Sequence, residues 1–305
     1  MDEIILLQDL VAQYIKEKSL TTPTQKNYIR IADQFSRETG IVQLDCIDFE
    51  QLLTWRIDVI ARSSSTTWNN YLRHLRALWN FAITRGYLHS DHNPFNDLHW
   101  GKAITKRPKI LSEKELRHVI AVINKDSFPY PPRWFWEIVI KFFYYSGLRR
   151  RQVVELKWSN IDLKKGIIKI TPEIEKTGRE RDLPIGSALS ELLQRYRTMV
   201  SATKPSALGL NCQVFNVTLY NPNYSTDEMT VSQLSGFFRR LSKQAGFPVS
   251  AHRFRHTMAT EIAKSGQIKE LQEILGHSDV RTTLTSYVHP QIEALRNSMN
   301  GLSNI

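Results

Sequence analysis

The sequence has 305 residues, of which 41 % are hydrophobic, and a mean hydropathy of -0.35, which predict a soluble protein of about two domains. No uncharged apolar run reaches 18 residues, the acidic N-terminus MDEIILLQDL does not fit a signal peptide, and two cysteines are too few for a disulfide framework or a zinc cluster. The net charge of +11 is concentrated in residues 111–305, with 27 basic against 18 acidic residues. Solvated side chains on the surface would explain this excess of positive charge, but binding to nucleic acid explains it better. We therefore expect a cytoplasmic, nucleoid-associated protein.

The first part of the chain predicts a small helical domain at residues 1–92. Thr22 is expected to cap a helix with Pro23 at its first position and Gln25 closing a capping box. Further helices are expected after Asp48 and over residues 66–84, where apolar residues recur at helical spacing. The polar face of the last helix carries Arg73 and Arg76. This face could simply be solvated, but we expect these arginines, together with Lys26, to contact a DNA backbone.

Residues 93–110 are predicted to be a basic interdomain linker, in which Arg107 is a further candidate DNA contact. A second domain, residues 111–305, begins with a capping box of Ser112 and Glu115 and continues into a strongly apolar helix. Two strand candidates follow, joined by the charged turn PEIEKTGRE, and then several helices. The predicted fold class is mainly helical with a small antiparallel β-sheet, α+β. The predicted strands are 166–171 and 181–185, and the later helices are 187–199, 232–245, 251–264, 268–275, 279–288 and 291–299.

Six residues of the second domain share one chemical theme. Two arginines supply planar paired donors for the non-bridging oxygens of a phosphodiester, while lysine and histidine can move a proton at a bridging oxygen. A tyrosine that follows them could act as a nucleophile if these groups surround its hydroxyl. The set comprises Arg149, Lys176, His252, Arg255, His277 and Tyr287.

Each member of this set has an ordinary structural explanation when it is taken alone. An arginine at a helix end is usually a favourable dipole contact, a lysine in a turn is usually solvated, and a tyrosine is often half-buried. His252 and His256 have the spacing of a zinc-protease helix, but Arg253 occupies the position of the required glutamate. The sequence also lacks a phosphate-binding loop of the Gly-x4-Gly-Lys-Ser/Thr type. We therefore expect no metal and no cofactor.

Taken in order, these motifs resemble the tyrosine recombinase, or phage integrase, family. They are Gly-Leu-Arg149, Lys176-Thr-Gly, His252-x-x-Arg255-His256, Leu-Gly-His277 and Tyr287. The resemblance covers most of the chain and implies that residues 1–92 form a helical, SAM-like core-binding domain. It also implies that residues 111–305 form the catalytic domain.

The resemblance implies a role for each of the six residues. Tyr287 would attack a DNA phosphate and form a 3′-phosphotyrosyl link, with Arg149 and Arg255 holding the non-bridging oxygens. Lys176 would protonate the leaving 5′ oxygen, His252 would accept the tyrosine proton, and His277 would donate a hydrogen bond to the phosphate. Gln152 departs from the family pattern, which often has an acidic residue at this position to brace the site.

The family implies a site-specific recombinase of double-stranded DNA that works as a homotetramer on DNA and has no membrane partner. Accessory DNA-bending proteins could also take part. Two other functions remain open from the sequence. A type IB topoisomerase would cleave and reseal one strand by the same chemistry, and a catalytically inactive relative would only bind DNA. Retention of all six residues argues against the inactive relative.

Overall fold

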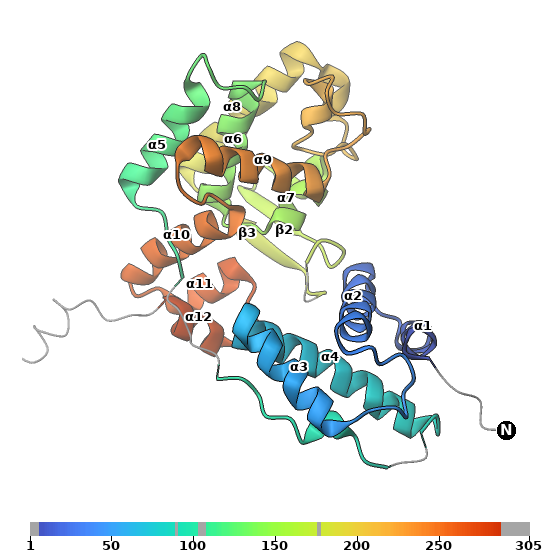
Figure 1. Cartoon of the computed structure of the whole chain (residues 1–305). Coiled ribbons are helices and arrows are strands. Elements are labelled where there is room, and N and C mark those ends of the chain that lie inside the picture. The colour runs from blue at the N-terminus through green and yellow to red at the C-terminus, as the bar shows by residue number, and fades with distance from the viewer. Residues whose placement is uncertain (1–5, 89–90, 103–107, 176–177, 288–305) are drawn as a thin grey trace, which may run out of the picture. The chain divides into compact units, whose positions relative to one another are not determined.

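The computed structural model describes residues 6–88, 91–102, 108–175 and 178–287, and the chain divides into two compact units, residues 1–106 and 107–305. Figure 1 colours the first unit blue to teal and the second green to red. The predicted fold class, mainly helical with a small antiparallel sheet, is confirmed. Lys176, Arg107 and the predicted helix at 291–299 lie outside the described residues.

In the described part of the first unit, four α-helices surround a core rich in aromatic residues. The largest fully buried side chains are Phe35, Trp68, Trp79 and Phe95, and their rings meet mostly edge to face or tilted, as favoured by the ring quadrupole. The helices are α1 (Leu7–Lys18), α2 (Thr22–Thr39), α3 (Phe49–Arg62) and α4 (Ser65–Thr84).

The start of α2 differs from its prediction. The N-cap is Thr21, not Thr22, and its side chain makes no capping hydrogen bond. The predicted capping box is wrong because the Gln25 amide instead donates to the carbonyl of Leu20 at 2.7 Å. Asp48 does cap α3, since its carboxylate accepts from the backbone N–H of Gln51.

The first half of the predicted linker belongs to the first unit. A short 3-10 helix, η1 (Pro94–Asn96), buries Phe95, and Leu98 is buried just after it. Asn69 of α4 then forms two hydrogen bonds with the backbone of Gly101, at 2.9 and 2.7 Å. Residues 93–101 of the predicted linker therefore pack on the first unit, because the side chains of Phe95 and Leu98 are buried in its core.

The second unit packs helices around the apolar α6 (Arg133–Ser146) and one small sheet. The sheet has the order β1-β2-β3 and is antiparallel throughout, with Ile168 and Leu183 opposite one another and both buried. The strands are β1 (Ile161–Asp162), β2 (Ile167–Ile170) and β3 (Arg181–Pro184). The helices besides α6 are α5 (Glu113–Asn124), α7 (Arg150–Glu155), α8 (Ser187–Thr203), α9 (Val231–Ala245), α10 (Ala251–Lys264), α11 (Ile268–Leu275) and α12 (Val280–Tyr287), with 3-10 turns η2 (Trp158–Asn160), η3 (Pro205–Leu208) and η4 (Val217–Leu219).

The junction between α6 and α7 is fixed against α10. Gly147 ends α6 with φ +60°, a conformation that favours glycine, and a Cβ atom there would lie 1.8 Å from Cε of Met258 on α10. Since α6 and α10 pack together, this close approach brings Arg149 beside the first turns of α10. The later helices α11 and α12 pack on α10 and on each other, as the orange and red ribbons of Figure 1 show.

Candidate active site

Arg255 lies buried at the centre of the cluster and bridges the ends of two helices. Its guanidinium donates to the carbonyl of Gly147 at 2.7 Å and to that of Leu275, the last residue of α11, at 2.5 Å. Helix C-termini carry partial negative charge, which favours a cation there. Burial, followed by the nearby Arg149, lowers the pKa of Arg255 to about 9, so the group remains charged at neutral pH.

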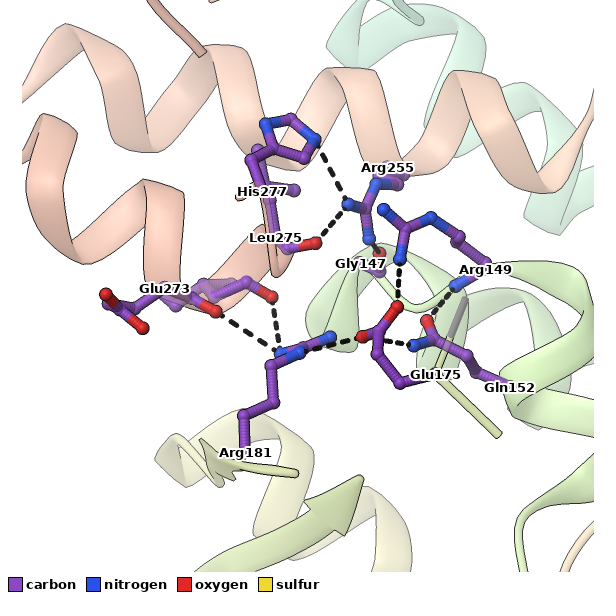
Figure 2. A network of polar contacts seen from close by, with 10 residues as sticks. Gly147, Arg149, Gln152, Glu175, Arg181, Arg255, Glu273, Leu275 and His277 are labelled. Atoms are coloured by element: carbon purple, nitrogen blue, oxygen red, sulfur yellow. Dashed lines mark hydrogen bonds and ion pairs between the residues drawn. The ribbon is translucent and has the colours of Figure 1, made fainter. Parts of the chain in front are cut away.

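Arg149 lies beside Arg255 and is held by a buried polar network, which Figure 2 shows. Its Nη1 lies 2.7 Å from Oε1 of Glu175, and its backbone N–H donates to the side-chain oxygen of Gln152 at 2.8 Å. The amide nitrogen of Gln152 donates to Glu175 at 3.0 Å. Gln152 thus joins the network as a neutral bridge and not as an acid.

His277 follows the end of α11 and lies next to Arg255. Its Nε2 is 3.5 Å from Nη2 of Arg255, and its Nδ1 is 2.9 Å from the hydroxyl of Thr283. Burial, Arg255 and Arg149 lower the pKa of His277 to about 4, so the ring is neutral at pH 7. A hydroxyl both donates and accepts, so Thr283 can support either tautomer, including the one whose Nε2–H would donate to a phosphate.

Tyr287 ends α12 with its ring buried, 5 % exposed, against α10. Its hydroxyl lies 2.7 Å from Nδ1 of His256, and burial lowers the pKa of that histidine to about 4, which keeps it neutral. Burial also raises the pKa of the Tyr287 hydroxyl, while Arg255 and Arg149 act in the opposite direction. A neutral histidine beside a tyrosine in a cationic setting is a proton acceptor for a phenolic nucleophile.

His252 does not contact the tyrosine directly in the described residues. Its ring centre lies 4.0 Å from that of His256, one turn along α10, and partial burial followed by Arg255 lowers its pKa. The histidine that lies within hydrogen-bond distance of the Tyr287 hydroxyl is therefore His256, to which the sequence assigned no role. Its i, i+4 relation to His252 was the available signal.

The structure brings five of the six sequence-predicted residues into one cluster. Arg149, His252, Arg255, His277 and Tyr287 come from the α6–α7 junction, α10, the α11 C-terminus and α12. Among the described residues, no group of three or more His, Cys, Asp or Glu side chains is arranged to hold a metal ion. Within the same ranges, no helix has the length and apolar character needed to cross a membrane.

The candidate DNA contacts of the first unit differ in the exposure and contacts of their side chains. Lys26 on α2 and Arg73 on α4 are exposed. Arg76 is used by its own chain, since its guanidinium donates to the carbonyls of Phe95 at 2.8 Å and Leu98 at 2.7 Å. These donors hold residues 95–98 against α4, and a contact of Arg76 with DNA stays a prediction.

Comparison with known proteins agrees with this geometry. Residues 109–293 match the model of the phage integrase family. A protein of Pseudomonas syringae that carries the provisional name tyrosine recombinase XerC is 30 % identical over 310 residues, which cover 96 % of this chain and 63 % of the relative's length.

Two solved structures share the fold across nearly the whole chain. The Tn1549 transposon integrase in complex with a circular intermediate DNA superposes with a TM-score of 0.77 at 21 % identity, covering 98 % of this chain and 100 % of that one. A lambda integrase tetramer bound to a Holliday junction gives a TM-score of 0.72 at 19 % identity, covering 93 % and 78 %. The match to the family model, over more than half of the sequence, establishes that the chain belongs to the phage integrase family of tyrosine recombinases.

Proposed function

We propose that the chain is a site-specific DNA recombinase that cleaves and rejoins duplex DNA through a 3′-phosphotyrosyl intermediate at Tyr287. The observation that carries the proposal is the 2.7 Å contact of the Tyr287 hydroxyl with neutral His256, in a cluster that also contains Arg149 and Arg255. A phenol with an ordinary pKa of about 10 is a poor nucleophile at neutral pH without such an acceptor.

The proposed reaction exchanges one phosphoester for another. The Tyr287 oxygen bonds to phosphorus while its proton passes to a histidine, the bond from phosphorus to the 5′ oxygen breaks, and Lys176 protonates that oxygen. Arg149 and Arg255 hold the non-bridging oxygens, and His277 donates a third hydrogen bond. A free 5′ hydroxyl then attacks the phosphotyrosine and reverses these steps, so the bond energy is conserved without ATP.

A nicked suicide substrate tests this chemistry, because loss of a short 5′ fragment prevents resealing. With duplexes made from the DNA that flanks the gene, a protein–DNA band should persist on a denaturing gel. Comparing His256→Ala with His252→Ala in the same assay identifies the principal proton acceptor, since its removal should slow adduct formation more. DNA binding without any adduct would favour the inactive alternative, and strand exchange between two sites separates recombination from topoisomerase activity.

Lys176 is proposed as the acid for the leaving group. Lys176→Ala should slow cleavage by about 100- to 10,000-fold, the usual contribution of a general acid. A substrate with sulfur at the 5′ bridging position should largely restore the rate, because a thiolate leaves without protonation. The exposed Lys169 of β2 offers a control. The cleavage rate of Lys169→Ala, relative to wild type, should be the same on the oxygen and the sulfur substrate. If sulfur gave Lys176→Ala no advantage, the acid would have to be another group.

We propose that the protein assembles as a homotetramer on two DNA sites, with exposed Lys26 and Arg73 contacting the duplex. The lambda integrase tetramer on a Holliday junction supports this by analogy of fold. The expected result is a change from a smaller species to four protomers only when site DNA is added, measured by sedimentation. A tetramer without DNA, or a monomer on paired sites under recombining conditions, would contradict the proposal.

A further inference from the structure

We propose that Glu175 is the positioning residue of this active site: its buried carboxylate sets Arg149 and, through Arg181, the end of α11 that carries His277. The inference rests on the proposed function and adds a residue to it. Gln152, where the family often has an acid, then has a defined part. Its amide holds the carboxylate of Glu175 and does not supply one itself.

The carboxylate of Glu175 is completely buried and both of its oxygens are engaged. Oε1 lies 2.7 Å from Nη1 of Arg149, while Oε2 accepts from Gln152 at 3.0 Å and lies 3.1 Å from Nε of Arg181. Figure 2 shows the side chain between the two guanidinium groups. With 0 % exposure of this side chain, Glu175 acts on a phosphate only through the arginines that it orients.

Arg181 extends this control to the other side of the site. Its Nη1 donates to the carbonyl of Ile274 at 2.8 Å, next to Leu275, whose carbonyl accepts from Arg255. Two arginines thus bind consecutive carbonyls at the end of α11, immediately before Gly276 and His277. Displacing Arg181 would therefore move the segment that positions His277.

Gly276 shows how closely these groups approach α11. Its φ is +61°, and a Cβ atom there would lie 2.7 Å from Nε of Arg181 and 3.0 Å from Oε2 of Glu175. The first distance is too short for a Cβ atom and the second is tighter than most Cβ contacts, so glycine at this position lets the ion pair lie against the helix end. The contact between the carboxylate and this backbone is therefore built into the fold.

The backbone of Glu175 is also held on both sides. Its backbone N–H donates to the carbonyl of Thr171 at 3.0 Å, and its own carbonyl accepts from the N–H of Gly178 at 3.1 Å. Lys176 is the next residue in the chain. Glu175 thus connects Arg149 with the helix end before His277, and its own backbone is fixed one residue before Lys176 in the sequence.

The charge of Glu175, and not only its shape, is what the site requires. Burying guanidinium groups without a counter-charge is unfavourable, and removing one partner of a buried ion pair leaves the other uncompensated. Glu175→Gln keeps the size of the side chain but removes its charge and replaces one acceptor oxygen with an NH2 donor, so Arg149 and Arg181 lose their carboxylate. Arg149 should then turn away from the position from which it would hold a phosphate oxygen.

The test compares Glu175→Gln with wild-type protein in single-turnover cleavage of the nicked substrate. A displacement of about 1 Å can cost about 100-fold in rate, so we expect a loss of this size with DNA affinity unchanged within about threefold, since the wider basic surface provides most of the binding. A second substrate carries a methylphosphonate at the scissile position and so lacks one charged oxygen. On this substrate the ratio of the wild-type cleavage rate to that of Glu175→Gln should be at least about tenfold smaller than on the ordinary phosphate. A defect that only disturbed the structure would slow cleavage of the phosphate and of the methylphosphonate substrate by the same factor.

Two further variants complete the design. Glu137→Gln, which removes a half-buried carboxylate paired with Lys141 near the start of α6, is the matched control and should cleave at the wild-type rate. The exchange Gln152→Glu with Glu175→Gln moves the carboxylate within the same hydrogen-bonded pair and should regain at least about tenfold over Glu175→Gln. If Glu175→Gln does not fold, the exchanged variant should still cleave within about tenfold of wild type.

Several results would overturn the inference: cleavage by Glu175→Gln within threefold of wild type, an equal loss on both substrates, or no recovery on exchange. The wild-type adduct is scored first in the same assay. Absence of this adduct would count against the proposed function. If the adduct forms but Glu175→Gln cleaves like wild type, only the role of Glu175 is contradicted.

Discussion

Replacing Tyr287 with phenylalanine is expected to abolish the covalent protein–DNA adduct while DNA affinity stays within about twofold of wild type. The substitution removes one oxygen and keeps a ring that is 5 % exposed and packed on α10. Loss of the hydrogen bond to His256 should cost about 1 kcal/mol of stability. The arginines proposed to hold the phosphate remain, so binding survives but no atom is left to form the phosphoester.

The nicked substrate distinguishes these effects in one experiment. Wild-type protein should be trapped and peptide mapping should locate the adduct at Tyr287, whereas Tyr287→Phe should give no adduct at any protein concentration that saturates the DNA. Tyr144→Phe and Tyr145→Phe, at the end of α6, serve as controls and should be trapped normally. An adduct on Tyr287→Phe, or one mapped to another tyrosine, would show that the nucleophile has been misassigned.

Hydrophobic periodicity and capping chemistry predicted most of the helices because both are local. The capping box of Ser112 and Glu115, for example, is present in full. Local signals do not show the tertiary contacts that a segment makes. Residues 93–101 read as a linker because they contain proline, glycine and charge, yet Phe95 is buried in the first core. The two-residue strand β1 is too short to show an alternating pattern.

The sequence predicted five residues that the structure brings together, because the proposed chemistry requires particular residue types in a known order, and their catalytic roles stay predictions. The supporting residues of the site could not be predicted, because their contacts join distant parts of the chain. Glu175 lies in a charged turn that reads as solvated, and only the fold shows that it is buried between Arg149 and Arg181. His256 was part of a recognised motif, but its contact with Tyr287 depends on how α12 packs against α10.

Replacing Arg255 with lysine is expected to slow cleavage by roughly 1,000-fold at pH 8.5 and to make the remaining activity rise, relative to wild type, as the pH falls. A lysine cannot reach the carbonyls of Gly147 and Leu275 and a phosphate oxygen together, because its donors radiate from one nitrogen. Losing one preorganised donor already costs about 100- to 1,000-fold. The expected pH dependence has a separate cause, which is the protonation state of the buried lysine.

The pH dependence follows from the surroundings that bring the pKa of Arg255 from its usual 12.5 to about 9, chiefly burial and then Arg149. The same surroundings would lower the pKa of a lysine at this position from its ordinary value of about 10.4, because burial and a neighbouring cation both disfavour the charged form. Since the pKa of lysine starts below that of arginine, the substituted lysine should be protonated to a greater extent at pH 6 than at pH 8.5, while Arg255 stays charged at both. The ratio of variant to wild-type cleavage rates should rise about tenfold between these two pH values. Arg151→Lys, on the exposed Arg151 paired with Glu155, should give a flat ratio. A flat ratio for Arg255→Lys as well would mean that charge at this position does not limit cleavage.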